Sequence, residues 1–225
     1  MSILKSLWIL AAKDLRIEYR SREAFQTTLF FAVLILIIFQ FAFDPGSKAT
    51  LEASPGILWV ALLFPGMIRL NQSFQMEIEE DSLHGIVLSP VDRGAFFLGK
   101  FLANWVFLAL VGLASTVAFV VFYNFAPSAR LWWLLVVELM GLAGFSAVGT
   151  VLAAMVAKSS SREVLLPILI FPIVIPVIVA AVNASQEILL RDDLNTLGTW
   201  MQVLGVFDVV YLAAGFVVFE YVVGD

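Results

Sequence analysis

The densest group of chemically active side chains in the sequence is a run of acids in a polar segment. Glu77, Glu80 and Asp81 precede His84 at helical spacing, so a helix would present all four side chains on one face. An acidic face of this kind can dock a soluble partner through its charge. The alternative is a solvated, charged turn.

Two further acids, Glu138 and Asp208, interrupt long apolar runs. A carboxylate at membrane depth is costly and usually faces the interior of a helix bundle or a water path. Each residue could serve a substrate or proton pathway, or it could form a hydrogen bond between helices. Both interpretations stay open for Asp208. Glu138 lies about two turns from the end of its run, close enough to reach water, which favours the hydrogen bond.

Three prolines, Pro167, Pro172 and Pro176, fall within one apolar run and predict a kinked helix. Membrane helices tolerate proline where neighbouring helices or water satisfy the freed carbonyls. A kinked span suits a transporter that moves, although prolines also occur in static bundles. The preceding run carries small residues that favour close helix packing over a ligand site. These residues are Gly141, Ala143, Gly144, Ala147 and Gly149.

The sequence contains none of the common catalytic motifs. It has no phosphate-binding Gly-x-x-x-x-Gly-Lys-Ser/Thr loop, no Gly-x-Ser-x-Gly elbow and no His-Glu-x-x-His pair. The absence of cysteine excludes disulfides and thiolate metal sites. A net charge of −5 gives no sign of a nucleic-acid partner. We therefore predict no catalytic site and no metal site in this chain.

Composition places the chain among membrane proteins. Hydrophobic residues make up 61% of the 225 and charged residues 14%, and the mean hydropathy is +0.98. A soluble domain is nearer 45–50% apolar and about 25% charged. The fold class expected is an all-α membrane protein with six transmembrane helices in a single domain, 1–225. The predicted spans are about 24–43, 53–70, 101–123, 131–157, 164–182 and 198–219.

Positive charges set the expected orientation of these spans. Ten Lys and Arg residues fall on the face shared by the two termini and three on the other. The positive-inside rule therefore places both termini in the cytoplasm. It also makes 71–100 a cytoplasmic segment and 183–199 an external loop.

Residues 1–22 are predicted to form an interfacial helix. Basic side chains occupy one arc of this helix and apolar side chains the other, so it can lie along the cytoplasmic leaflet. Asp14 and Glu18 interrupt the apolar side. The alternative is a simple cytoplasmic extension of the first span.

Short motifs follow one another through nearly the whole chain. They are Lys13–Leu15, Tyr19–Ala24, Leu70–Phe74 with Glu77, Glu79 and Glu80, Leu88–Gly94, Leu98–Lys100, Leu166–Pro176, Phe207–Val209 and Phe219–Tyr221. In order and spacing they resemble the heme exporter protein B (CcmB) family, the membrane subunit of the cytochrome c maturation ABC transporter. The tail departs from this pattern, because it ends in Gly224 and Asp225 where a further glutamate is expected.

The resemblance implies a type II ABC exporter-like (ABC-2-like) permease of the bacterial inner membrane. Such a subunit would pair as a homodimer with two copies of a separate ATPase, CcmA, and work with CcmC, CcmD and the heme chaperone CcmE. ATP hydrolysis would drive release of heme-loaded CcmE, and 74–85 would be the coupling helix that fits a cleft on the ATPase. The coupling residues implied are Phe74, Glu77, Ile78, Glu79, Glu80, Asp81 and His84.

The available side chains also bear on heme. Heme iron is usually held by His, Cys, Met or Tyr. The chain has no Cys, and its one histidine, His84, falls in the segment expected to be cytoplasmic. We expect no directly bound cofactor, with ATP on the partner ATPase and heme handled by partner subunits.

Three alternatives remain from the sequence. A permease of the same architecture could export another substrate, such as a drug or polysaccharide. A proton-coupled carrier or channel could use Glu138 and Asp208 without an ATPase. An intramembrane enzyme is the third, and it lacks any nucleophile–base or metal constellation.

Overall fold

The computed structural model describes residues 3–79, 92–126, 128, 130–157, 159–191 and 194–222. Seven α-helices and one short π-helix account for most of this described part. Their bounds are α1 (Ile3–Ser21), α2 (Glu23–Ala42), α3 (Lys48–Glu79), α5 (Arg93–Phe122), α6 (Leu131–Val156), α7 (Arg162–Gln186), η1 (Glu187–Arg191) and α8 (Leu194–Val222).

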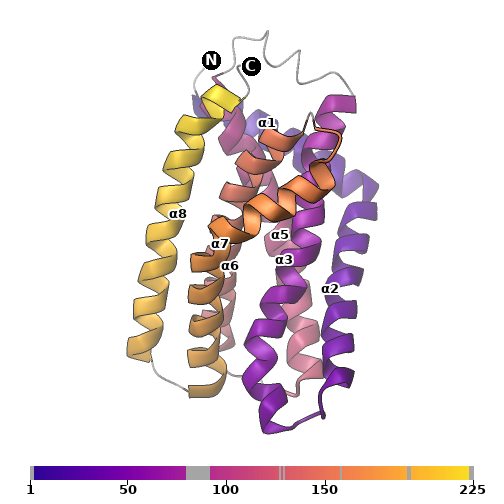
Figure 1. The fold of residues 1–225 in the computed structure, drawn as a ribbon, viewed down its shortest axis with the longest axis vertical. Helices are drawn as coiled ribbons and strands as arrows, with labels where there is room; N and C mark the ends of the chain where they lie inside the picture. The colour runs from indigo at the N-terminus through magenta and orange to yellow at the C-terminus, as the bar shows by residue number, and fades with distance from the viewer. Residues whose placement is uncertain are drawn as a thin grey trace.

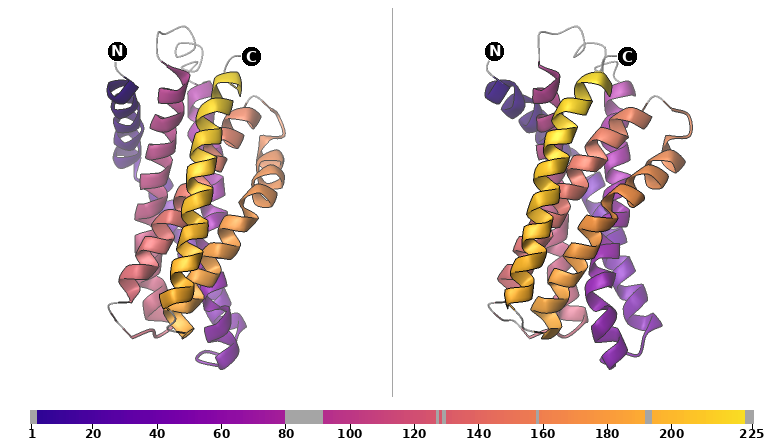
Figure 2. Two further views of the ribbon diagram at one scale, coloured as in Figure 1. Left: turned by 90° about the vertical axis from the view of Figure 1, so that its left-hand side faces the viewer. Right: turned by 60° about the vertical axis from the view of Figure 1, so that its left-hand side comes forward.

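The predicted all-α fold with six membrane-length helices is confirmed. The six helices α2, α3, α5, α6, α7 and α8 are each long and apolar enough to cross a bilayer. They run side by side along the long axis of the molecule (Figure 1). The first turns of α1 and the last turns of α8 lie at the same end of the bundle, as an even number of spans requires (Figures 1 and 2).

Two polar segments that follow predicted spans are helical in part. Residues 71–79 continue α3 without a break, so the second span and the start of the coupling segment form one helix. The loop expected at 183–199 is wrong: α7 runs on to Gln186, the π-helix Glu187–Arg191 follows, and α8 begins at Leu194.

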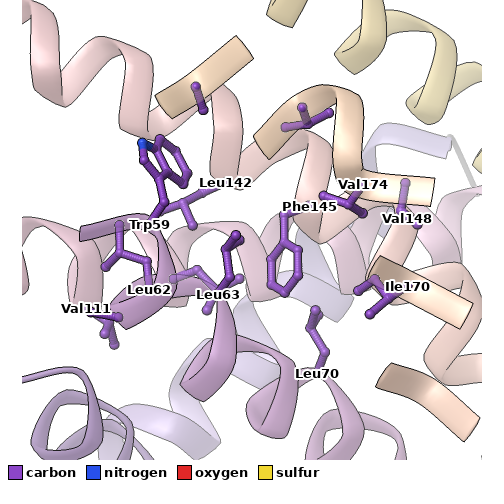
Figure 3. Packing of buried hydrophobic residues seen from close by; sticks show 14 of the residues in the cluster. Trp59, Leu62, Leu63, Leu70, Val111, Leu142, Phe145, Val148, Ile170 and Val174 are labelled. Atoms are coloured by element: carbon purple, nitrogen blue, oxygen red, sulfur yellow. The ribbon is translucent and has the colours of Figure 1, made fainter. Parts of the chain in front are cut away.

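The core lies where α3, α5, α6 and α7 meet, as the labelled side chains in Figure 3 show. Trp59 of α3 lies against Gly141 of α6, where a larger residue would collide with its ring. The indole Nε1–H of Trp59 donates to Oγ of Ser185 in α7 at 3.0 Å. The glycine thus lets a tryptophan join three helices, which is the close packing predicted for the small-residue face of α6.

Candidate functional site at one end of the bundle

The cytoplasmic segment predicted from the sequence begins as an extension of α3. This helix has 32 residues, which corresponds to a length of about 48 Å. About 20 residues suffice to cross the hydrocarbon layer, so the C-terminal part of α3 projects beyond it. Glu77, Ile78 and Glu79 form its last residues. Glu80, Asp81 and His84 lie outside the described residues, so their role in coupling stays a prediction.

The chain returns to the bundle at Asp92, which caps α5. Its side chain accepts a hydrogen bond from the backbone N–H of Ala95 at 3.0 Å, a favourable N-cap contact. Arg93 and Gly94, expected in a turn, are the first residues of α5. Arg93 also donates to the carbonyl of Glu220 at 2.9 Å and so ties the start of α5 to the end of α8.

An ion pair joins α1 to α3 just before this extension. Oε2 of Glu18 accepts a hydrogen bond from Nη2 of Arg69, and only 10% and 8% of the two side chains is exposed. The guanidinium also lies 4.8 Å from the ring centre of Phe107 in α5, a cation–π distance. Removing one partner of this pair should destabilise the protein far more than breaking a surface salt bridge, because the remaining charge would be buried without a counter-charge.

A second ion pair joins α1 to α5 on the other flank. Nζ of Lys100 lies 2.9 Å from Oδ2 of Asp14 and donates to the carbonyl of Ser73 in α3 at 3.2 Å. Gly99 makes the approach possible, since a Cβ there would lie 2.9 Å from Cβ of Leu10 in α1. We call the four charged residues of the two pairs the acid–base clamp: Asp14, Glu18, Arg69 and Lys100.

The ion pairs of the acid–base clamp explain why two acids lie on the apolar face of α1. Asp14 and Glu18 are four residues apart, so they lie on one side of the helix, and that side faces α3 and α5 instead of lipid. Sequence reasoning counted Arg69 and Lys100 among the positive charges that set orientation and gave neither of them a structural role. The signal for their role is the pair of acids at helical spacing on an apolar face, near two bases at span ends.

An aromatic cluster lies beside the clamp. Phe219 of α8 is fully buried, with its ring centre 6.5 Å from that of Phe74, 5.8 Å from that of Phe96 and 5.5 Å from that of Phe97. Phe74 was predicted as a coupling residue, and its 2% exposure places it in the packing beneath the segment. The cluster therefore holds together the end of α3, the start of α5 and the end of α8.

The two intramembrane acids each pack against a glycine of a neighbouring helix. Glu138 of α6 is 3% exposed, so it does not reach water as expected, and it lies against Gly112 of α5. Its Oε2 accepts a hydrogen bond from the hydroxyl of Thr116 at 2.8 Å, which is the predicted interhelical bond. Asp208 of α8 is half-buried, and a Cβ on Gly144 of α6 would lie 2.7 Å from its Oδ1. The structure does not bring the two acids into a hydrogen bond or ion pair with each other within the described residues.

We expect Gly112→Ala to lower the free energy of unfolding by about 1–3 kcal/mol, because the new methyl group collides with the carboxylate of Glu138. Gly56→Ala in α3 is the matched control, since a Cβ there meets nothing within 4 Å. That change should be neutral or slightly stabilising. Denaturant titration in mild detergent measures both. Equal effects would contradict the close packing at Gly112.

The prolines predicted to kink one span all lie within α7. The helix continues through Pro167, Pro172 and Pro176 but bends part-way along its length (Figures 1 and 2). Tyr211 of α8 donates its hydroxyl to the carbonyl of Ile173 at 2.6 Å, within the proline-rich stretch. This hydrogen bond attaches α8 to the bent stretch of α7.

Six membrane-length helices around one apolar core define a polytopic membrane protein of the permease class. The described residues contain no group of three His, Asp or Glu side chains able to hold a metal ion. The two buried ion pairs and the Arg93–Glu220 hydrogen bond lie at the end of the bundle where α3 projects and α5 begins.

The chain belongs to the CcmB protein family, whose model matches residues 5–220. It is similar to the heme exporter protein B of Pseudomonas aeruginosa, with 30% identity over 178 residues and 79% of each chain covered. The heme exporter protein B of Rhodobacter capsulatus is 28% identical over 170 residues, covering 76% of this chain and 78% of the relative. That of Bradyrhizobium diazoefficiens is 24% identical over 186 residues, covering 83% of each. The resemblance inferred from the motifs is confirmed.

Proposed function

We propose that this chain is the permease subunit of a heme-exporting ABC transporter that acts in cytochrome c maturation. The observation that carries the proposal is the family match over residues 5–220 together with relatives named heme exporter protein B. The subunit lies in the bacterial inner membrane with both termini in the cytoplasm, the orientation that the distribution of Lys and Arg favours.

ATP hydrolysis in this proposal belongs to a separate subunit, CcmA, because the sequence carries no phosphate-binding loop. The ATPase binds at the projecting end of α3 and the segment that follows, through the acids Glu77, Glu80 and Asp81. A homodimer of this chain would engage two ATPase copies. CcmC, CcmD and the chaperone CcmE are the further partners.

The mechanism follows from what holds the coupling segment. The acid–base clamp attaches α1 to α3 at Arg69 and to α5 at Lys100, the two helices that flank the segment. Phe219 ties the same two helices to α8. A movement imposed by the ATPase would thus displace α3, α5 and α8 together. The proline-bent α7 is the span best suited to bend further in response. This movement would rearrange the partner subunits and release heme-loaded CcmE.

Heme itself passes to partner subunits without strong ligation by this chain. No cysteine is available, and the one histidine, His84, lies in the segment proposed to meet the ATPase. A purified complex of this chain with CcmA alone should therefore show no stoichiometric histidine-ligated heme spectrum. Such a spectrum would overturn this part of the proposal.

The experiment that tests the proposal is co-purification of CcmA with the tagged chain. Reversing the charges of Glu77, Glu80 and Asp81 to lysine should reduce the recovered ATPase about tenfold or more, because desolvated charge pairs at interfaces are strongly coupled. Reversing Glu52, an exposed acid of the same helix near its other end, is the matched control and should leave recovery unchanged. If the wild-type chain recovers no ATPase, the ABC transporter proposal fails.

A further inference from the structure

A groove opens between α1, α2 and the middle of α5, on the outer side of the acid–base clamp. Its volume is about 790 Å³, within the range of sites that hold small molecules. Figure 2 shows α1 at the edge of the bundle beside the first turns of α5.

The wall of the groove is apolar and belongs to the membrane-spanning part of the chain. Phe25 of α2 and Val106, Phe107 and Leu110 of α5 form much of it. Leu110 is 52% exposed, so about half of its side chain is open at the groove. An apolar wall at this depth suits hydrocarbon chains and excludes a water-soluble occupant.

The charged residues of the groove come from α1 and the corner between α1 and α2. Arg16 and Arg22 both line the groove and are both exposed. Arg22 has a φ of 52° and forms the corner itself, so its position is fixed by the turn of the backbone. The third charge, Glu18, is paired with Arg69 and does not oppose an anion. Two arginines therefore line the groove beside an apolar wall.

The buried side chain of Arg69 lies next to this groove. Its side chain is 8% exposed, and Nε and Nη1 find no hydrogen-bond acceptor among the described residues. It lies directly behind Phe107 and Glu18, two residues of the groove. Its charge balances that of Glu18, so the buried pair adds no net negative charge behind the groove.

The geometry points to a binding site for one anionic glycerophospholipid of the cytoplasmic leaflet. The phosphate lies between Arg16 and Arg22, where charge-assisted hydrogen bonds to guanidinium groups are strong. The acyl chains lie along Phe25, Val106 and Leu110. A bound lipid would fill the space between α1 and the spans and stabilise α1 in the position in which its acids reach Arg69 and Lys100.

Native mass spectrometry of the full chain in mild detergent tests this site, with phosphatidylglycerol and phosphatidylcholine of identical acyl chains as probes. We expect about one phosphatidylglycerol retained per chain and at least about fivefold less phosphatidylcholine. The double variant Arg16→Gln and Arg22→Gln should lower phosphatidylglycerol retention about tenfold. Leu110→Trp, which fills the groove, should lower it similarly.

The matched controls make the same kinds of substitution at residues outside the groove. Lys5→Gln with Arg162→Gln removes two positive charges at the same end of the bundle, and neither residue lines the groove. Leu113→Trp enlarges an outward-facing residue of the same helix that also lies outside it. Both controls should retain lipid as the wild type does.

Three results would overturn the proposal. Equal retention of the two lipids would remove the preference for an anion. Unchanged retention in both groove variants would place the lipid elsewhere. Loss of a homodimer in Leu110→Trp, with lipid retention intact, would assign the groove to a second copy of the chain.

Discussion

Replacing Arg69 with glutamine is expected to lower the free energy of unfolding by about 3–5 kcal/mol, the range found when one partner of a buried ion pair is removed. The substitution leaves Glu18 as an unpaired carboxylate that is 10% exposed. It also removes the cation from the ring of Phe107. Denaturant titration in mild detergent, followed by helix content, measures the loss.

A double-mutant cycle measures the interaction energy between Glu18 and Arg69 apart from the other effects of each substitution. Glu18→Gln combined with Arg69→Gln should recover a large part of the loss, because neither charge then remains buried alone. Lys48→Gln is the matched control, since Lys48 pairs with Glu52 at the surface with 90% and 62% of the side chains exposed. That change should stay within about 0.5 kcal/mol. Additive single effects of Glu18 and Arg69 would contradict a coupled pair.

The spans could be predicted from the sequence because crossing the bilayer requires about 20 consecutive apolar residues, and few other structural elements contain such long apolar runs. The ends of the helices could not, since polarity does not stop a helix. Asn71 and Gln72 end the apolar run, yet α3 continues to Glu79. No glycine or proline interrupts this stretch, and the backbone of a projecting helix remains hydrogen-bonded in water as it is in lipid.

The external loop was mispredicted for the same reason. Residues 183–197 contain neither glycine nor proline, and they hold helical structure on both sides of 192–193. A local ion pair, Arg191 with Glu187 at 3.0 Å, stabilises the π-helix there. Polar composition predicts where the chain leaves the membrane but says little about backbone conformation.

The acid–base clamp lay beyond sequence reasoning because its partners are far apart in the chain. Glu18 and Arg69 are 51 residues apart, and periodicity reports only which side of its own helix a residue occupies. Sequence reasoning placed Asp14 and Glu18 among the apolar residues of α1, and the structure buries Glu18 and Ala11 there while leaving Trp8 exposed. What that side would face is set by the packing of α1 on α5, which depends on Gly99.

Phe219→Ala is expected to cost about 3–5 kcal/mol of unfolding free energy, as truncation of a buried phenylalanine usually does. Phe219 is fully buried among Phe74, Phe96 and Phe97, so the change leaves a cavity where three helices meet. Tyr221→Ala removes a 73% exposed ring two residues along the same helix. It is the matched control and should change stability by less than about 0.5 kcal/mol.

The same variant links this packing to the proposed coupling. Phe219 packs against Phe74, which lies three residues before Glu77 on α3. Phe219→Ala should therefore weaken recovery of the ATPase with the tagged chain, even where gel filtration shows a folded membrane subunit. Phe219→Leu restores most of the buried volume and should restore both stability and recovery. Full ATPase recovery with Phe219→Ala, despite the lost stability, would show that docking depends on the acids alone and not on how the end of α3 is held.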